Sequence, residues 1–366
     1  MKKLLVNVVI ITMGLTAFVQ ESLAGNESRS GQAGASELLI NPWSRSSGWA
    51  GANASNVKGL ESMYLNVAGM SFTKKTEFLF SHTNYIAGSG IGINAFGFSQ
   101  HVGTSGVLGF AVNSMSFGEI PITTVDNPEG NIGTFRPQFT NINLAYSKEF
   151  SNSIYGGINV KLISQNIANA SARGVGIDAG IQYLTGTNEE KNNVHFGIAI
   201  KNVGPPMKYQ GDGFSFRGYA PTNGYIAPNS PASPVTPNAY TMTLEQRSAQ
   251  FELPSLLNIS GAYDFKFGTM HRLTPAFTFV SNSFTRNNYN VGLEYGFKSY
   301  LMLRAGYSYE PLGDSGSTKT FFTGPCGGVT FEVPLNKKGS TFGIDYSYRA
   351  TNPFKGVHSF GVRMSI

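Results

Sequence analysis

The chain has 366 residues, of which 13% are charged and 13% aromatic, with 44 Gly, one Cys and a formal net charge of +6. Soluble globular domains usually carry about 25% charged residues and about 7% Gly, so this composition is atypical of them, and its aromatic content excludes a disordered chain. The single cysteine excludes a disulfide framework and a Cys-based zinc site, and the mild positive charge is too small to indicate a nucleic-acid partner.

Residues 1–24 predict a secretory signal peptide. Lys2 and Lys3 form a basic start, residues 4–19 are an apolar stretch, and Ser22 and Ala24 occupy the small-residue positions of a cleavage site. The mature chain is therefore expected to begin after Ala24 and to be exported across the inner membrane of a Gram-negative cell. Beyond this segment no run approaches the roughly 18 apolar residues that a membrane helix requires.

The body of the chain alternates between apolar and small polar residues. In residues 174–183, for example, Val175 and Ile177 alternate with Gly174 and Gly176. Successive side chains of a strand point to opposite faces, so such segments have one apolar and one polar face. A soluble β-sandwich would carry many Lys and Glu on the polar face, whereas here that face is mostly Gly, Ser and Asn. The pattern therefore predicts an all-β fold, a monomeric transmembrane antiparallel β-barrel in the outer membrane.

Counting the alternating segments predicts about 14 strands in a barrel that spans residues 76–366. Short connections at 151–152, 267–270 and 335–339 are expected on the periplasmic side, and the longer 119–133 and 205–249 on the outside. The predicted strands are 77–85, 90–101, 106–118, 134–150, 153–166, 172–186, 192–204, 250–267, 270–284, 287–298, 300–313, 318–334, 340–351 and 355–366.

Residues 25–75 precede the first strand and are expected to fold inside the barrel as a hatch, because so wide a lumen must be lined, plugged or filled with water. Charged residues on the lumen side have mixed signs, which favours internal pairing over an ion-selective path. Lys161, Lys201, Asp264, Lys266, Asp345 and Arg363 belong to that lumen set. The residues predicted to join the hatch to the lumen wall are Arg45, Glu61, Asn66, Asp178, Glu294 and Arg304.

The connection 205–249 is the strongest candidate for a functional surface. It contains seven prolines and shows no strand pattern, and unstructured loops of this length are uncommon unless they are functional or disordered. Its aromatic side chains would supply contact area for a partner protein, and the alternative is a cover over the barrel's own mouth. The aromatic residues are Phe214, Phe216, Tyr219, Tyr225 and Tyr240.

Motifs that could indicate enzymatic chemistry have simpler explanations. Residues 313–316 (GDSG) match the surroundings of a serine-protease nucleophile but fall in a predicted loop, and the glycine-rich 88–92 leads into a strand rather than a helix. The five histidines show no metal-ligand spacing. Cys326 is expected to be an inert residue in the twelfth strand, where Pro325 and the adjacent glycines imply a bulge. We therefore expect no catalytic residues, metal or cofactor.

Two short motifs suggest a family. Residues 45–48 (RSSG), followed by Ala52 and Ala54, and then residues 66–69 (NVAG), resemble the N-terminal signature of FadL-like barrels. Together with residues 200–205 (IKNVGP), they make the chain most similar to the PorV/PorQ branch of Bacteroidota. Two departures, at residues 49–50 and at Val67, indicate a paralogue. The resemblance implies a 14-stranded barrel with an N-terminal plug and a role in the type IX secretion system.

The sequence thus supports a non-enzymatic adaptor or subunit of a protein-export machine, with the type IX translocon first. An accessory role in a β-barrel assembly complex is a second hypothesis. The alternative from another class is a FadL-like transporter of hydrophobic small molecules, although the hatch is mostly Ser, Gly, Ala and Asn. The expected partners are a large translocon or insertase barrel, secreted cargo domains, and the surrounding lipid and lipopolysaccharide.

Overall fold

The computed structural model describes residues 27–185, 193–220, 240–298, 300–311, 321–336 and 339–366. The predicted signal peptide, the 313–316 motif and Tyr225 lie outside these residues. Within the described chain no helix is long and apolar enough to cross a membrane.

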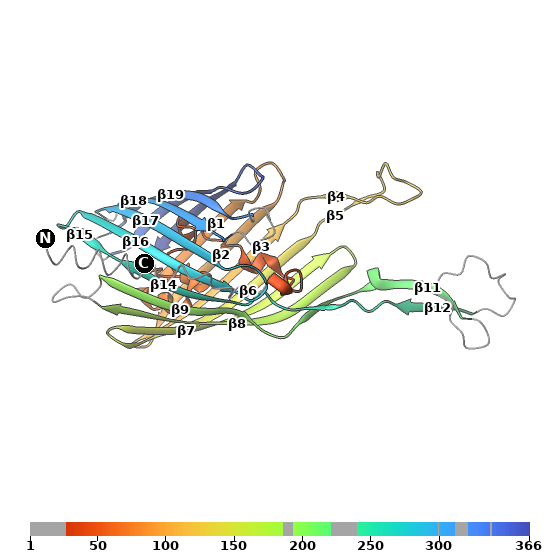
Figure 1. Ribbon diagram of the computed structural model, residues 1–366, viewed down its shortest axis with the longest axis horizontal. Helices are drawn as coiled ribbons and strands as arrows, with labels where there is room; N and C mark the ends of the chain where they lie inside the picture. The colour runs from red at the N-terminus through yellow and green to blue at the C-terminus, as the bar shows by residue number, and fades with distance from the viewer. Residues whose placement is uncertain (1–26, 186–192, 221–239, 299, 312–320, 337–338) are drawn as a thin grey trace.

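The main body is a closed antiparallel barrel of 14 strands, which confirms the predicted fold class and strand number (Figure 1). Each strand pairs with its neighbours in the chain, and β1 pairs with β21 to close the barrel. The strands are β1 Thr76–Asn84, β2 Gly92–Val102, β3 Gly106–Ser116, β6 Gln138–Ser151, β7 Ile154–Ile167, β8 Ala170–Thr185, β9 Val194–Val203, β14 Leu256–Tyr263, β16 His271–Asn282, β17 Asn288–Phe297, β18 Leu301–Tyr309, β19 Gly324–Pro334, β20 Thr341–Arg349 and β21 Val357–Ser365.

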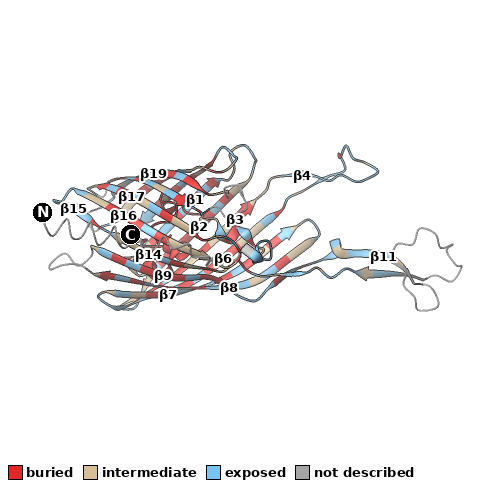
Figure 2. Cartoon of the chain, viewed as in Figure 1, coloured by how far each residue is buried: buried red, intermediate tan, exposed pale blue. Residues whose placement is uncertain are grey.

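Burial alternates along the strands, as Figure 2 shows. In β1, Leu79 and Ser81 are buried inside the barrel, whereas Phe78 and Phe80 are exposed on the outer wall. An outer wall of exposed apolar side chains is what a lipid environment requires, because burial in hydrocarbon replaces burial in a protein core. Exposed apolar residues of this wall include Leu144, Ile158, Leu162, Ile181, Phe196, Val291, Leu303, Ile344 and Phe360.

The two ends of the barrel differ. At the short-turn end, β2 and β3 are joined by residues 103–105, β6 and β7 by residues 152–153, and β1 starts where β21 finishes. At the long-loop end, two hairpins project away from the barrel (Figure 1). One pairs β4 Ile120–Pro121 with β5 Thr134–Phe135, and the other pairs β11 Ser215–Ala220 with β12 Tyr240–Glu245.

Several predictions about strands were wrong in detail. The segment 205–249 contains β10 Met207–Gln210, η4 Asp212–Phe214, β11 and β12, although the sequence showed no strand pattern there. Strands of four to six residues are too short for alternation to stand out beside so many prolines. Residues 134–135 belong to the β4–β5 hairpin rather than to β6.

The predicted strand 250–267 is divided into β13 Gln250–Phe251, β14 and β15 Phe265–Phe267. Asp264 separates β14 from β15, but both strands pair with β16 in one register, so Lys266 keeps the lumen side of the sheet and is exposed there. The bulge predicted at Cys326 is also absent, because β19 pairs with β18 and β20 without a register shift there. Pro325 lies second in β19, and the start of a strand is one of the places where a sheet tolerates proline.

The N-terminal segment, residues 27–75, crosses the inside of the barrel. Its short helix α2 Ser44–Ser47 contacts β1, β19, β20 and β21, whereas η3 Val67–Phe72 contacts β3, β6, β7 and β8. The other helical turns are η1 Glu27–Arg29, η2 Ser36–Leu39 and α3 Ser62–Leu65.

Wall glycines allow this close approach. A Cβ atom added to Gly306 would lie 2.6 Å from the backbone of Trp49, and one added to Gly328 would lie 3.3 Å from the Cα atom of Gly48. The glycine-rich lumen face therefore brings the wall backbone against the backbone of the N-terminal segment.

Candidate functional site

At the short-turn end, the N-terminal segment is bound to the wall by a charged cluster that consists of Arg45, Glu61, Glu77, Glu332, Asp345 and Arg363. Arg45 Nε lies 3.1 Å from Asp345 Oδ1, and its Nη2 lies 3.2 Å from Glu332 Oε2. Arg363 Nη2 lies 2.5 Å from Glu61 Oε2, and its Nη1 lies 3.1 Å from Glu77 Oε1. Each arginine thus joins two carboxylates, and three of these four ion pairs run between the N-terminal segment and the wall strands.

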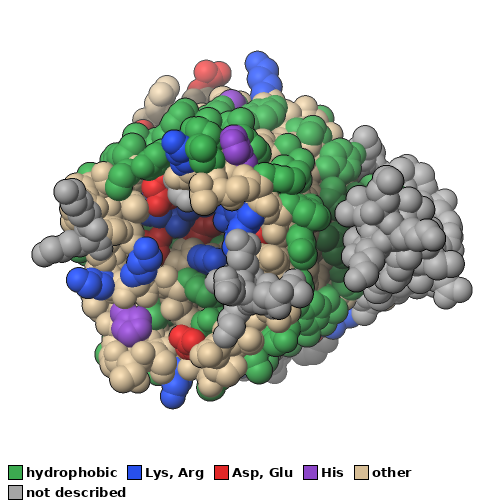
Figure 3. All heavy atoms as spheres, turned by 90° about the vertical axis from the view of Figure 1, so that its left-hand side faces the viewer, with side chains coloured by type: hydrophobic (Ala, Val, Ile, Leu, Met, Phe, Trp, Pro, Cys, Tyr) green, Lys and Arg blue, Asp and Glu red, His purple; other side chains and the backbone are tan. Residues whose placement is uncertain are grey.

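The electrostatics of the cluster favour the ionised form of Arg45. Burial opposes the charge of Arg45, but Asp345, Glu61 and Glu332 outweigh it and hold the Arg45 pKa above its ordinary value. Ser46 Oγ donates a hydrogen bond to Glu61 Oε1 at 3.0 Å, which occupies a further carboxylate lone pair. Figure 3, which looks onto the short-turn end, shows Lys, Arg, Asp and Glu side chains gathered in a hollowed centre inside the apolar outer wall.

A second group of charges lies on β16, β17 and β18. Arg304 Nε lies 2.7 Å from Glu294 Oε2, and Arg272 pairs with the other oxygen of the same carboxylate. Arg304 Nη1 also donates to Thr330 Oγ1 at 2.6 Å, and Thr330 in turn donates to Asp345. Thr330 therefore links this group to the charged cluster.

On the opposite side of the lumen, the segment is held by neutral hydrogen bonds. Asn66 Nδ2 donates to the carbonyl oxygens of Ile181 at 3.0 Å and Ile198 at 3.4 Å, while its Oδ1 accepts from the Ala68 amide. Asn66 is only 1% exposed, so these contacts satisfy an amide that would otherwise be costly to bury.

Asp178 lies deeper in the same wall. Its carboxylate lies 2.7 Å from Lys161 Nζ. It also accepts hydrogen bonds from the backbone N–H of Asn202 at 2.7 Å and from Asn159 Nδ2 at 3.2 Å. Lys201 is buried nearby, and its ammonium lies 3.7 Å from the centre of the Tyr64 ring in a cation–π contact. Two lysines thus accompany one carboxylate.

Glu37, in η2, is buried closer to the long-loop end. Its two carboxylate oxygens accept from Gln165 Nε2 at 2.8 and 2.9 Å. Burial raises the pKa of Glu37 above its ordinary value, and the Gln165 hydrogen bond opposes that shift.

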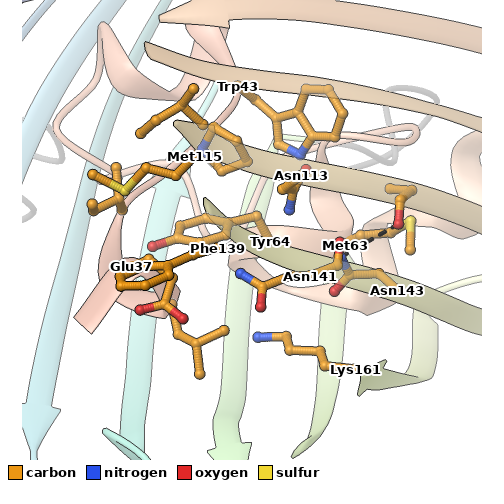
Figure 4. A pocket seen from close by; sticks show the side chains of 15 residues that line it. Glu37, Trp43, Met63, Tyr64, Asn113, Met115, Phe139, Asn141, Asn143 and Lys161 are labelled. Atoms are coloured by element: carbon orange, nitrogen blue, oxygen red, sulfur yellow. Dashed lines mark hydrogen bonds between the residues drawn. The ribbon is translucent and has the colours of Figure 1, made fainter. Parts of the chain in front are cut away.

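A cavity of about 40 Å³ opens between the N-terminal segment and strands β2, β3, β6 and β7 (Figure 4). This is room for a few water molecules, whereas pockets for drug-sized ligands are several times larger. Its wall is mixed, with Trp43, Met63, Tyr64, Met115 and Phe139 beside Asn141, Asn143 and Lys161.

The six predicted hatch contacts thus occupy three places. Arg45 and Glu61 both belong to the charged cluster, Glu294 and Arg304 pair with each other inside the wall, and Asn66 and Asp178 contact different groups near β8 and β9. Sequence reasoning missed Glu37, Tyr64, Glu77 and Glu332. Glu77 shares the lumen side with Leu79 and Ser81, a signal that could have revealed it.

Four of the five predicted aromatic residues lie in the β11–β12 ribbon or directly beside it. Phe214 ends η4, Phe216 and Tyr219 lie in β11, and Tyr240 begins β12. Phe216 pairs with Leu244, and Gly218 with Met242, so these residues share one face of the ribbon. Phe216 is 52% and Met242 39% exposed, whereas Arg217 and Thr243 lie on the other face. The ribbon is therefore amphipathic, and its apolar face is open to solvent.

Among the described residues, no group of three or more His, Cys, Asp or Glu side chains is arranged to hold a metal ion. His195 Nε2 lies 3.1 Å from Asp264 Oδ2, and Cys326 is buried with its thiol directed to the Gly48 carbonyl at 3.4 Å.

No protein-family model matches the chain, and no curated protein matches it in sequence. Among solved structures, it is similar to the crystal structure of a FadL homologue of Pseudomonas aeruginosa, with a TM-score of 0.50 and 12% identity over 89% of this chain and 98% of that one. At this identity the likeness establishes the fold, an outer-membrane type of barrel.

Two further structures are less similar. The toluene transporter TodX of Pseudomonas putida gives a TM-score of 0.48 and 11% identity over 85% of this chain and 93% of that one. CdiB from Acinetobacter baumannii gives a TM-score of 0.37 and 11% identity over 80% of this chain and 60% of that one.

Proposed function

We propose that this protein is a non-enzymatic subunit of a protein-export machine in the outer membrane, and that the β11–β12 ribbon docks it to the machine's large translocon barrel. The observation that carries this proposal is the open apolar face of Phe216, Met242 and Leu244 on a ribbon that projects beyond the barrel. An isolated two-stranded hairpin is only marginally stable in water, and an uncovered apolar face is typical of a surface that binds a partner.

The ion pairs inside the barrel favour the same function. The ion pairs of the charged cluster join the N-terminal segment to three strands, so we propose that the segment is a permanent plug of the lumen rather than a part that leaves to admit solutes. The resemblance of residues 45–48, 66–69 and 200–205 together to the PorV/PorQ branch makes the type IX translocon the first candidate machine and a β-barrel assembly complex the second. Secreted cargo domains are expected at the same outer surface.

The second candidate function is transport of a small hydrophobic molecule. It is favoured by the cavity of Figure 4, where Trp43 and Met63 of the N-terminal segment and Phe139 of β6 contribute apolar side chains to the lining. The small volume of the cavity makes this function second to docking.

The test is affinity purification of the tagged protein from native membranes in mild detergent, read by mass spectrometry. In the deletion variant, residues 212–246 are replaced by a short Gly-Ser turn, which leaves the paired strands β10 and β13 in place. A sharper variant combines Phe216→Ser with Met242→Thr on the apolar face. Its matched control combines Arg217→Gln with Thr243→Ser on the opposite face.

We expect a translocon barrel to co-purify with the wild type and the control, and to be lost from the deletion and the apolar-face variant. Co-purification of an insertase would instead identify the assembly complex. Purification of the wild-type protein without any partner barrel would contradict docking. If the purified barrel carries a hydrophobic molecule, and the cavity-filling substitution Ala111→Leu displaces that molecule, the transporter function replaces the docking function.

A further inference from the structure

Arg349, the last residue of β20, differs from the other arginines inside the barrel. Its guanidinium lies 4.2 Å from the centre of the Phe322 ring, and its Nη2 donates to the Phe322 carbonyl at 3.3 Å. Phe322 packs in turn against Phe321 and Tyr85, so an aromatic cluster covers the guanidinium on this side. Such a covering limits the access of water to one side of the half-buried Arg349 and lowers the local dielectric, which makes an uncompensated charge costly.

No carboxylate offsets this charge among the described residues. Arg45, Arg304 and Arg363 each form an ion pair with at least one carboxylate, whereas Arg349 forms none, and the acidic groups that influence it are Cys326, Tyr64 and Tyr85. Its Nε is buried without a hydrogen-bond partner. A cationic donor is therefore left without an acceptor.

A second unsatisfied donor comes from the N-terminal segment. Asn41 Oδ1 accepts a hydrogen bond from the Trp43 amide at 3.0 Å, which fixes the orientation of the side-chain amide. The Asn41 Nδ2 group is buried and has no hydrogen-bond partner. Asn41 and Arg349 line the same small hollow.

The hollow is otherwise polar and narrow. Ser47, Thr83, Ser347 and Ser359 contribute hydroxyl groups to its wall, beside the apolar Ile40, Val357 and Phe322. It offers about 10 Å³, close to the space that one water-sized occupant needs. An organic ligand is too large for this space, so the occupant must be a single small species.

We propose that this hollow binds one small inorganic anion of chloride size, between Arg349 Nε and Asn41 Nδ2. Both unsatisfied groups are donors, one belongs to a cation, and the Ser347 hydroxyl can turn its hydrogen towards a negative charge. A water molecule would satisfy one donor or both but would leave the buried charge unbalanced. The anion would also join the N-terminal segment to β20, as a carboxylate does at the other end of the lumen.

The first test is long-wavelength anomalous diffraction from crystals of the mature protein grown in sodium chloride and in sodium gluconate. We expect an anomalous peak within hydrogen-bond distance of Arg349 Nε and Asn41 Nδ2 in chloride, and none in gluconate, whose anion is too large for the hollow. Ordinary water density with no anomalous signal in chloride would overturn the proposal.

The second test uses Asn41→Asp, which places a carboxylate where the anion would lie and keeps the acceptor for the Trp43 amide. The wild type is expected to unfold a few degrees higher in chloride than in gluconate at equal ionic strength, because an anion that binds only the folded state stabilises it. Asn41→Asp is expected to lose that difference and to match the chloride value in both salts. Asn53→Asp, in the same segment but outside the hollow, is the control and should keep the wild-type difference. An equal loss of stability in both salts for Asn41→Asp would contradict an anion site.

Discussion

The two halves of the lumen balance their charges differently. Towards the short-turn end, Arg45, Arg304 and Arg363 are each paired with a carboxylate, and the pairs of Arg45 and Arg363 join the N-terminal segment to the wall. Towards the long-loop end, Lys161 and Lys201 accompany one carboxylate, Asp178, and Arg349 has none among the described residues. Both hollows of the lumen described above, the cavity of Figure 4 and the one at Arg349, lie in this second half.

This difference shows how one buried segment can be rigid at one end and receptive at the other. A buried ion pair is expensive to break, since removing one partner leaves an uncompensated charge. A cation without a carboxylate instead favours an outside anion or dipole. We therefore expect the short-turn half to hold the segment in place and the long-loop half to respond to solutes and pH.

The largest effect is expected from Arg363→Met, which leaves Glu61 and Glu77 buried without their cation. The free energy of unfolding should fall by about 3–5 kcal/mol. Trp43 and Trp49 are the only two tryptophans of the chain and both lie in the N-terminal segment, so their fluorescence in a urea titration reports on that segment. Arg136→Met, which breaks the exposed pair with Glu119, is the control and should cost less than about 1 kcal/mol. Similar costs for the two variants would refute a clamp at the short-turn end.

A smaller effect should separate the two lysines of the long-loop half. Lys161→Met removes the cation from Asp178, which keeps its hydrogen bonds from Asn159 and Asn202. We therefore expect the free energy of unfolding to fall by about 2–3 kcal/mol. Lys201→Met removes a cation that no carboxylate binds among the described residues, and keeps an apolar contact with Tyr64. Its cost should be below about 1 kcal/mol, or the variant should be more stable. The same urea titration measures both, and the reverse order would contradict the charge assignment.

The smallest effect concerns pH. Burial raises the pKa of Glu37 above its ordinary value of 4.5, so the folded state binds this proton more tightly than the unfolded chain does. The contribution of Glu37 to stability is therefore fully present below the ordinary pKa and is lost as pH rises through the raised value.

Glu37→Gln keeps a neutral acceptor for Gln165 at every pH. We expect this variant to gain stability relative to the wild type as pH rises from about 4 to about 8, measured as the difference between their urea midpoints. Glu119→Gln, at an exposed ion pair, is the control and should show no such trend. Parallel pH curves for Glu37→Gln and the wild type would show that Glu37 is not desolvated.

The strand pattern could be predicted from the sequence because alternation is a local property. Whether Leu79 or Phe80 faces the lipid depends only on the position of each residue along its own strand, and so the fold class and the 14 strands were predicted correctly. Local signals failed where they were short or interrupted. The six-residue β11 was hidden among prolines, and the predicted strand 250–267 is divided into three shorter strands.

The same local reasoning placed Arg304, Glu294 and Asp345 on the lumen face, but it could not say which groups they meet. Arg363 contacts Glu61 across 302 positions of sequence, and Gln165 contacts Glu37 across 128. Such pairs depend on strand register and on the path of the N-terminal segment through the barrel. The sequence alone therefore determined which residues face the lumen. The tertiary structure alone decided which charges are balanced there and which donors are left without a partner, because charge balance depends on distances between segments that are remote in the chain.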